Sequence, residues 1–115
     1  MSSQRSLRVA EEIKKELSQI IQSEMKDPRL GFLSVTDVEI SQDLRYVKAF
    51  VSILGSDKER EVTLGVLQRA SGFLRTELGK RIRLRHTPEL SFHLDTSIEQ
   101  GAKIEKLLRE LESKK

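Results

Sequence analysis

Apolar residues recur at three- and four-residue intervals near the start of the chain and predict an amphipathic helix from Ser6 to Met25. Glu and Lys occupy most positions between them, so one face can pack while the other meets solvent. Asp27-Pro28 should end the helix, because a residue before proline is pushed out of the α region and proline has no N–H to donate. The apolar positions are Val9, Ala10, Ile13, Leu17, Ile20 and Ile21.

Residues 32–41 and 44–54 alternate with a period of two and predict two strands joined by a short polar turn, a β-hairpin. In the second strand the odd positions 47–53 are apolar, whereas the even positions 46–52 are polar or aromatic. The first strand changes parity between Val35 and Val38, which predicts a β-bulge near Thr36 and Asp37.

A second helical stretch is expected from Asp57, which we predict as its N-cap, to about Leu84. Ser71 and Gly72 interrupt it and predict a kink. Thr87-Pro88 should end this element, and residues 90–94 predict a third strand with Phe92 at its centre. A last helix is predicted from Thr96. The order α-β-β-kinked α-β-α predicts one α+β domain over residues 1–115 with frayed ends, its core lying in residues 5–112.

Composition excludes several classes of protein. The chain has 115 residues and no cysteine, so disulfides, zinc knuckles and thiol nucleophiles are ruled out. No apolar run approaches the ~20 residues that span a bilayer, and the start lacks the apolar core of a secretion signal. We therefore expect a cytoplasmic protein with no membrane partner.

Positive charge is concentrated in one segment, residues 69–86. It holds 6 of the 21 bases and only 1 of the 18 acids, Glu77, which leaves 15 bases and 17 acids elsewhere. Cations along one element favour nucleic-acid binding, because each neutralised phosphate releases counterions. A solvated helix face is the alternative, but with a single acid we expect the segment to lack the Glu–Lys pairs of the first helix. The bases are Arg69, Arg75, Lys80, Arg81, Arg83 and Arg85.

The residues offer little for catalysis. His86 and His93 are separated by a proline turn and fit no metal-ligand spacing, and neither phosphate-binding glycine motif is present. We expect no catalytic residue, metal or cofactor. A small hydrolase that uses either histidine is the weakest alternative, and an α+β module whose basic segment binds an acidic protein is a stronger one.

Sequence motifs distinguish two modes of RNA binding. Base stacking on the sheet needs several strand aromatics, but only Tyr46 and Phe50 share a strand face. A KH-type domain clamps the RNA backbone with a G-x-x-G corner, which is missing here; Ala70-Ser71-Gly72 occupies that corner.

Four blocks in order resemble the ribosome-binding factor A family of bacterial small-subunit assembly factors, over residues 5–108. The resemblance implies a single type-II KH-like domain, with a three-stranded sheet, helices on one face and an Ala-x-Gly kink in place of G-x-x-G. The blocks are Lys26-Asp27-Pro28-Arg29-Leu30-Gly31, Val38-Glu39-Ile40-Ser41 with Asp43-Leu44, Ala70-Ser71-Gly72-Phe73-Leu74-Arg75, and residues 84–92.

The resemblance further implies a monomer that binds free or immature small subunits and their precursor rRNA, not DNA. It would promote late maturation of the 5′ end of that rRNA without catalysis and matter for growth in the cold. Some relatives carry a longer tail than the one that ends here at Lys115, so contacts made by such a tail are not expected. The implied RNA-binding residues are Arg69, Ala70, Ser71, Gly72, Arg75, Lys80, Arg81, Arg83 and Arg85, with Arg5 and Arg8 on the first helix as weaker candidates.

Overall fold

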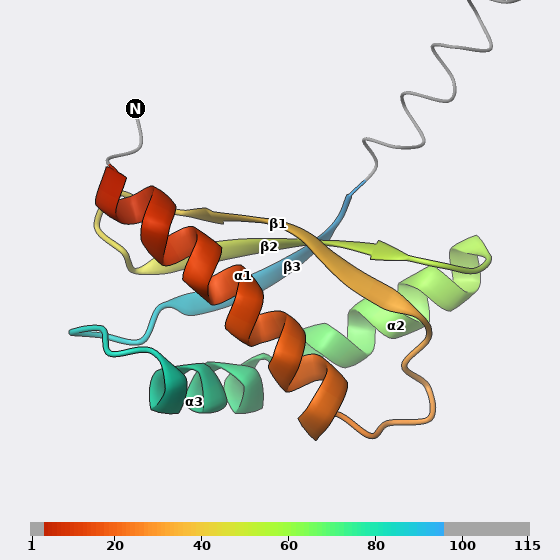
Figure 1. The fold of residues 1–115 in the computed structure, drawn as a ribbon. Coiled ribbons are helices and arrows are strands. Elements are labelled where there is room, and N and C mark those ends of the chain that lie inside the picture. The colour runs from red at the N-terminus through yellow and green to blue at the C-terminus, as the bar shows by residue number, and fades with distance from the viewer. Residues whose placement is uncertain (1–3, 96–115) are drawn as a thin grey trace, which may run out of the picture.

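The computed structural model describes residues 4–95 and begins with helix α1 (Gln4–Glu24), drawn in red and orange in Figure 1. The predicted apolar stripe is the buried face of this helix. Ile13, Leu17 and Ile20 are fully shielded from solvent and form part of one continuous core with the sheet. Burial of each such side chain stabilises the fold by roughly 1.5–3 kcal/mol relative to exposure.

Strands β1 (Leu33–Ile40) and β2 (Tyr46–Ile53) form the predicted antiparallel hairpin. Their register shifts between Val35 and Asp37, which confirms the predicted bulge. The extra residue is Thr36, whose hydroxyl donates to the Phe50 carbonyl at 3.2 Å. The bulge restores the parity of the apolar positions, so that both halves of β1 can face the core.

Strand β3 (Glu89–Leu94) lies parallel to β2, in the sheet order β1-β2-β3. Phe92 pairs in register with Ala49 and is only 2% exposed, so the predicted central position of this aromatic is confirmed. A parallel neighbour needs a long crossover connection, and helices α2 (Asp57–Arg69) and α3 (Ser71–Arg81) supply it.

The crossover helix is broken at Ala70, next to the predicted kink. Two details of the prediction are wrong. The helical part ends at Arg81 rather than near Leu84, and the N-cap is Ser56 rather than Asp57. The Ser56 hydroxyl accepts from the Glu59 amide at 3.2 Å, while the Glu59 carboxylate accepts from the Ser56 amide at 3.3 Å. This reciprocal capping box needs the serine one position before the first helical residue.

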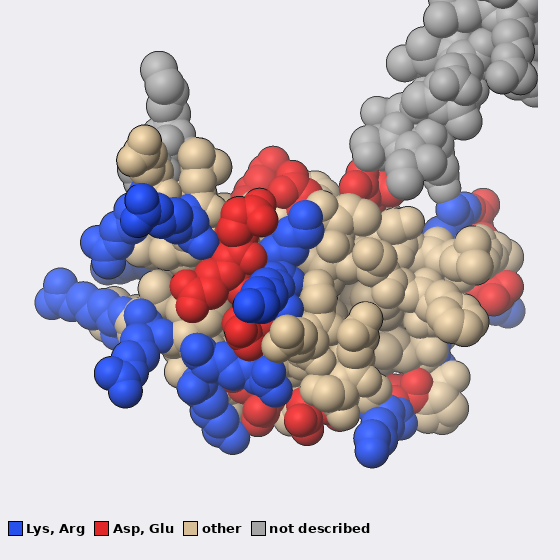
Figure 2. All heavy atoms as spheres, in the orientation of Figure 1, with Lys and Arg blue, Asp and Glu red and all other residues tan. Residues whose placement is uncertain are grey.

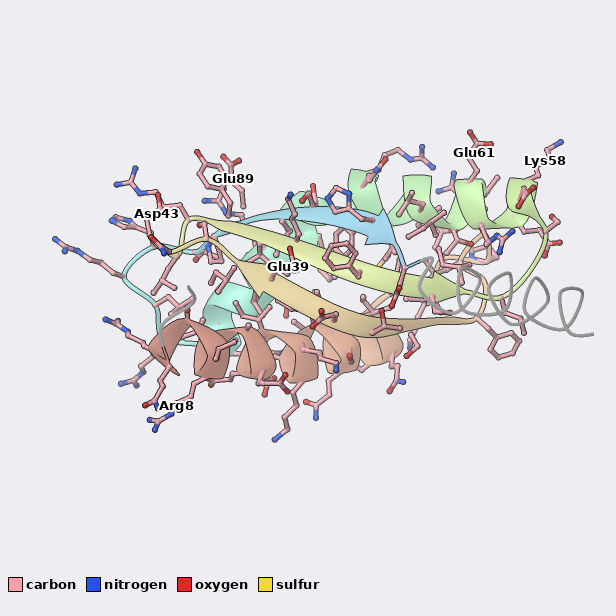
Figure 3. All side chains as sticks on the ribbon, turned by 90° about the horizontal axis from the view of Figure 1, so that it is seen from above. Arg8, Glu39, Asp43, Lys58, Glu61 and Glu89 are labelled. Carbon is pink, nitrogen blue, oxygen red and sulfur yellow. The ribbon has the colours of Figure 1, made fainter. Side chains whose placement is uncertain are left out.

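All three helices cover one face of the sheet and leave the other face open (Figures 1 and 3), which confirms the α+β class. From α1 to β3, the element order is the one that the resemblance to a type-II KH-like domain implied. The predicted last helix, from Thr96, lies outside the described residues. Within residues 4–95, none of the helices combines the length and apolar character that crossing a membrane requires.

Candidate nucleic-acid interface

Three segments far apart in sequence meet at one end of the molecule: the start of α1, the β1–β2 turn and the α3–β3 loop (Figure 1). Figure 2 shows many of the Lys and Arg side chains of this view gathered at that end. We call it the basic end and define it by five exposed arginines, Arg5, Arg8, Arg45, Arg83 and Arg85. A hollow of about 490 Å³ opens here, lined by Arg5, Gln42, Asp43, Leu44, Arg45, Leu84, Arg85 and His86.

The β1–β2 turn is shaped by its own polar side chains. The Asp43 carboxylate accepts from the Ser41 hydroxyl at 2.6 Å and from the Arg45 amide at 3.1 Å. These hydrogen bonds, the one from Ser41 being the stronger cause, lower the pKa of Asp43, so its carboxylate stays ionised. Leu44 takes up a left-handed conformation with φ of 62°, a sparsely populated state for a branched residue. The turn thereby presents Arg45 at the hollow.

Arg45 is a residue that the sequence analysis missed. The signal that could have found it is local, since the aspartate of a Ser-x-Asp turn accepts from the backbone amide two residues later, which here belongs to Arg45. The sequence around Arg45 does not show that this residue lies close to the basic segment, residues 69–86. The Glu89 amide donates to the Arg45 carbonyl at 2.8 Å, and this bond joins the turn to the end of the α3–β3 loop.

The α3–β3 loop, residues 82–88, is anchored at both ends because Ile82 and Pro88 are buried. Arg75 holds it from α3: its Nε and Nη2 donate to the Thr87 carbonyl at 3.2 and 2.8 Å. Gly79 lets helix and loop approach closely, because a Cβ there would lie only 2.8 Å from the Thr87 hydroxyl. Arg75 therefore holds the loop in place. Its phosphate contact stays a prediction.

Lys80 and Arg81 are both paired with acids. Lys80 Nζ lies 3.1 Å from Glu77 Oε1, and Arg81 Nη1 lies 3.4 Å from Glu16 Oε2 on α1. The Lys80–Glu77 pair contradicts the expectation that this segment lacks Glu–Lys pairs within its own helix. The Glu16 partner of Arg81 lies on α1 and is invisible in the local sequence. Such surface pairs contribute only about 0–1 kcal/mol, so a phosphate can compete for either cation.

The kink lies at the opposite end of α3 from the loop, about 16 Å away for an 11-residue helix. Arg69 ends α2 there, and Ala70 both closes α2 and opens α3 without a side-chain cap. Nothing lies within 4 Å of a Cβ built on Gly72, so the backbone is open to an approaching strand. The predicted residues thus form two groups, one at the kink and one near the basic end.

The two histidines do not converge. His86 lines the hollow, whereas His93 lies on the open face of the sheet, with its ring centroid 5.7 Å from that of Phe50. Among residues 4–95, no cluster of three or more histidines and acids is placed to hold a metal ion. The open face also carries acids: Glu39 faces Lys48 across β1 and β2, and Glu89 pairs with Tyr46. Its charge suits a polyanion less well than the charge of the basic end does.

A sheet covered by helices on one face, with a broken crossover helix and an arginine-rich end, defines a small α+β domain. The chain belongs to the ribosome-binding factor A family, because the pattern of that family, "Ribosome-binding factor A", matches residues 5–108. A Brevibacillus brevis protein of that name is 57% identical over 111 residues, or 96% of this chain and 92% of the relative.

Solved structures agree with this assignment. The NMR structure of a Thermotoga maritima protein described as a ribosome-binding factor A is 40% identical, with a TM-score of 0.74 over 86% of this chain and 94% of that one. A homology model of the Thermus thermophilus factor, fitted into the cryo-EM map of a 30S–RbfA complex, is 30% identical with a TM-score of 0.63. That match covers 76% of this chain and 91% of the Thermus chain.

Proposed function

We propose that this protein is a non-catalytic assembly factor that binds free or immature small ribosomal subunits and their precursor rRNA. The observation that carries the proposal is the similarity to the Thermus factor whose coordinates were fitted to a 30S complex. The five arginines of the basic end give a physical reason for affinity to RNA, since cations that displace condensed counterions bind phosphate without regard to sequence.

The site residues form one extended interface in this proposal. Arg69, Ala70, Ser71 and Gly72 receive the RNA backbone at the kink, and Arg83 and Arg85 grip it beyond the far end of α3. Arg5 and Arg8 add charge from α1, and Lys80 and Arg81 exchange their acid partners for phosphate. Arg75 acts by holding the loop. An RNA segment of several nucleotides is needed to span both groups.

The finer role is to favour one arrangement of precursor rRNA until the 5′ end matures, with cleavage left to separate nucleases. Binding shifts such an equilibrium only by the difference in affinity for the two arrangements. The protein acts as a monomer in the cytoplasm, and its contribution matters most in the cold, where RNA rearranges slowly.

Sedimentation of cell lysate tests the partner. The protein should travel with free small subunits and lose that association after ribonuclease treatment. Association that survives ribonuclease would instead favour the alternative of an acidic protein partner. With purified small-subunit RNA, the slope of log affinity against log salt should be roughly −3 to −4 for about five neutralised phosphates, and a flat dependence would contradict the proposal.

Gly72→Ala tests the kink. Alanine favours the helical state by up to about 1 kcal/mol, and the added methyl meets nothing in the free protein, so the domain should stay folded. If the RNA backbone approaches Gly72, the methyl will weaken binding. Unchanged affinity for RNA would remove the kink from the interface while leaving the basic end in place.

A further inference from the structure

The hollow at the basic end brings together cations that no local segment contains. Arg5 comes from α1, Arg45 from the β1–β2 turn and Arg85 from the α3–β3 loop, and all three line the same hollow. Asp43 is the acid among its lining residues, and the two leucines, Leu44 and Leu84, give it an apolar part. The arginines and the aspartate of the lining carry three positive charges and one negative charge.

The hollow is built on fixed backbone rather than on mobile side chains alone. The left-handed Leu44 and the two hydrogen bonds to Asp43 fix the turn. Glu89 joins that turn to the loop, and Arg75 holds the loop from α3. Strained backbone that the surroundings hold in place is found preferentially at binding sites, where it limits the reorganisation on binding.

We propose that this hollow is a seat for a single phosphate of the RNA backbone, gripped by Arg5, Arg45 and Arg85. The proposal rests on the proposed function. It adds one defined binding site for a phosphate and names Arg45 as a residue that contacts this phosphate. Guanidinium groups suit this ligand because their fork of N–H donors matches the oxygens of phosphate. Leu44 and Leu84 offer the adjoining ribose an apolar surface. Asp43 opposes the ligand by charge and limits its affinity.

Asp43 gives the sharpest test because its replacement should improve binding. In Asp43→Asn the side-chain oxygen still accepts from Ser41 and from the Arg45 amide, so the turn keeps its hydrogen bonds while the negative charge disappears. Affinity for small-subunit RNA should rise severalfold. If Asp43 only stabilised the turn, its replacement would not raise the affinity for RNA. Unchanged or weaker RNA binding by a folded Asp43→Asn variant would overturn the proposal.

Removal of the cations should have the opposite effect. Arg45→Ala and Arg85→Ala should each weaken RNA binding about tenfold, as expected for the loss of a charged hydrogen bond. Each should also flatten the salt slope, by no more than about 0.7, because the three arginines share one phosphate of single-stranded RNA. The matched control is Lys58→Ala, at the opposite end of the molecule (Figure 3), which should change neither quantity. Equal effects of all three variants would refute a discrete seat.

Arg75→Ala separates positioning from contact. This variant should weaken binding while leaving the salt slope at the wild-type value, because the loop loosens but no phosphate contact disappears. Amide hydrogen exchange should become faster in residues 82–88. A slope reduced as in Arg85→Ala would overturn the positioning role.

Inorganic phosphate tests the seat without RNA, so that its failure can be told from failure of the proposed function. At constant ionic strength, replacing chloride by phosphate should shift the NMR signals of residues 42–45 and 84–86, and Arg85→Ala should abolish the shifts. Shifts scattered over the surface, or none, would refute the seat even if the protein binds small subunits. An acidic peptide that produces the same shifts more strongly than phosphate would favour a protein ligand and overturn the assignment to RNA.

Discussion

At the scale of single residues, the structure reassigns side chains that look alike in sequence. In the sequence, the six cations of the basic segment look equivalent. In the structure, Arg75 donates to the Thr87 carbonyl, and Lys80 and Arg81 form ion pairs with acids. Arg83 and Arg85 form no hydrogen bond or ion pair with the rest of the described chain. The sequence shows where the cations lie along the chain, but the partner of each cation depends on how α3 packs against α1 and the loop.

Asp27 illustrates a residue whose behaviour is fixed locally. Its two carboxylate oxygens accept from Arg29 Nε and Nη2 at 3.0 and 2.7 Å, and its Oδ1 also accepts from the Arg29 amide at 2.9 Å. These bonds, the side-chain pair first, lower the pKa of Asp27 from 3.8 to about 2. Pro28 and Arg29 form a turn in which the Leu30 amide donates to the Asp27 carbonyl at 3.0 Å, and this turn brings Arg29 close to the Asp27 carboxylate.

The sign of the resulting pH dependence follows from the depressed pKa. The contribution of Asp27 to stability is complete above about pH 4 and is lost as the pH falls through about 2, where the folded carboxylate takes up a proton. NMR titration of the carboxyl carbon should show the low pKa, and Arg29→Ala should bring it back toward 3.8. An unchanged midpoint in Arg29→Ala would contradict the assigned cause. Asp27→Asn is the control that lacks the titration.

At the scale of elements, sequence patterns predicted nearly every helix and strand of residues 4–95, including the bulge and the break between α2 and α3. Hydrophobic periodicity predicts an element because one face of a helix or strand is buried, so that apolar residues recur with the repeat of that element. The first and last residues of the crossover helix were predicted less accurately. Ser56 and Asp57 are both good N-caps, and only the reciprocal bonds with Glu59 decide between them.

The cap of α2 makes a testable difference. Ser56→Ala should lower the free energy of unfolding by about 1 kcal/mol, because the Glu59 amide loses its acceptor at the helix start. Ser23→Ala in α1 is a matched control: the hydroxyl of Ser23 donates back to the Gln19 carbonyl, and alanine is the better helix former. Urea denaturation should therefore show a loss for the first variant and none for the second. Equal losses would contradict the capping assignment.

At the scale of the whole molecule, one core joins the covered face of the sheet to all three helices. The parallel pairing of β3 with β2 determines which loops lie together at each end of the sheet. It places the start of β3, and the basic loop before it, beside the β1–β2 turn. The basic end therefore exists only in the assembled fold.

Phe92 tests this dependence on the core. Phe92→Ala should destabilise the domain by about 3–5 kcal/mol, because a nearly fully buried ring leaves a cavity between the sheet and the helices. Tyr46→Ala, on the open face and 58% exposed, should cost far less. Both can be measured by urea denaturation, with RNA binding assayed where the variant remains folded. Comparable losses for the two aromatics would mean that the open face is packed in solution.

The sequence by itself determined the element types, their order and the local excess of positive charge, because periodicity, proline breaks and charge are properties of neighbouring residues. Only the tertiary structure decided that Arg5, Arg45 and Arg85 share one hollow. They lie about forty residues apart, and their meeting depends on strand order and helix packing. Those are set by burial of the common core, which no local segment encodes alone.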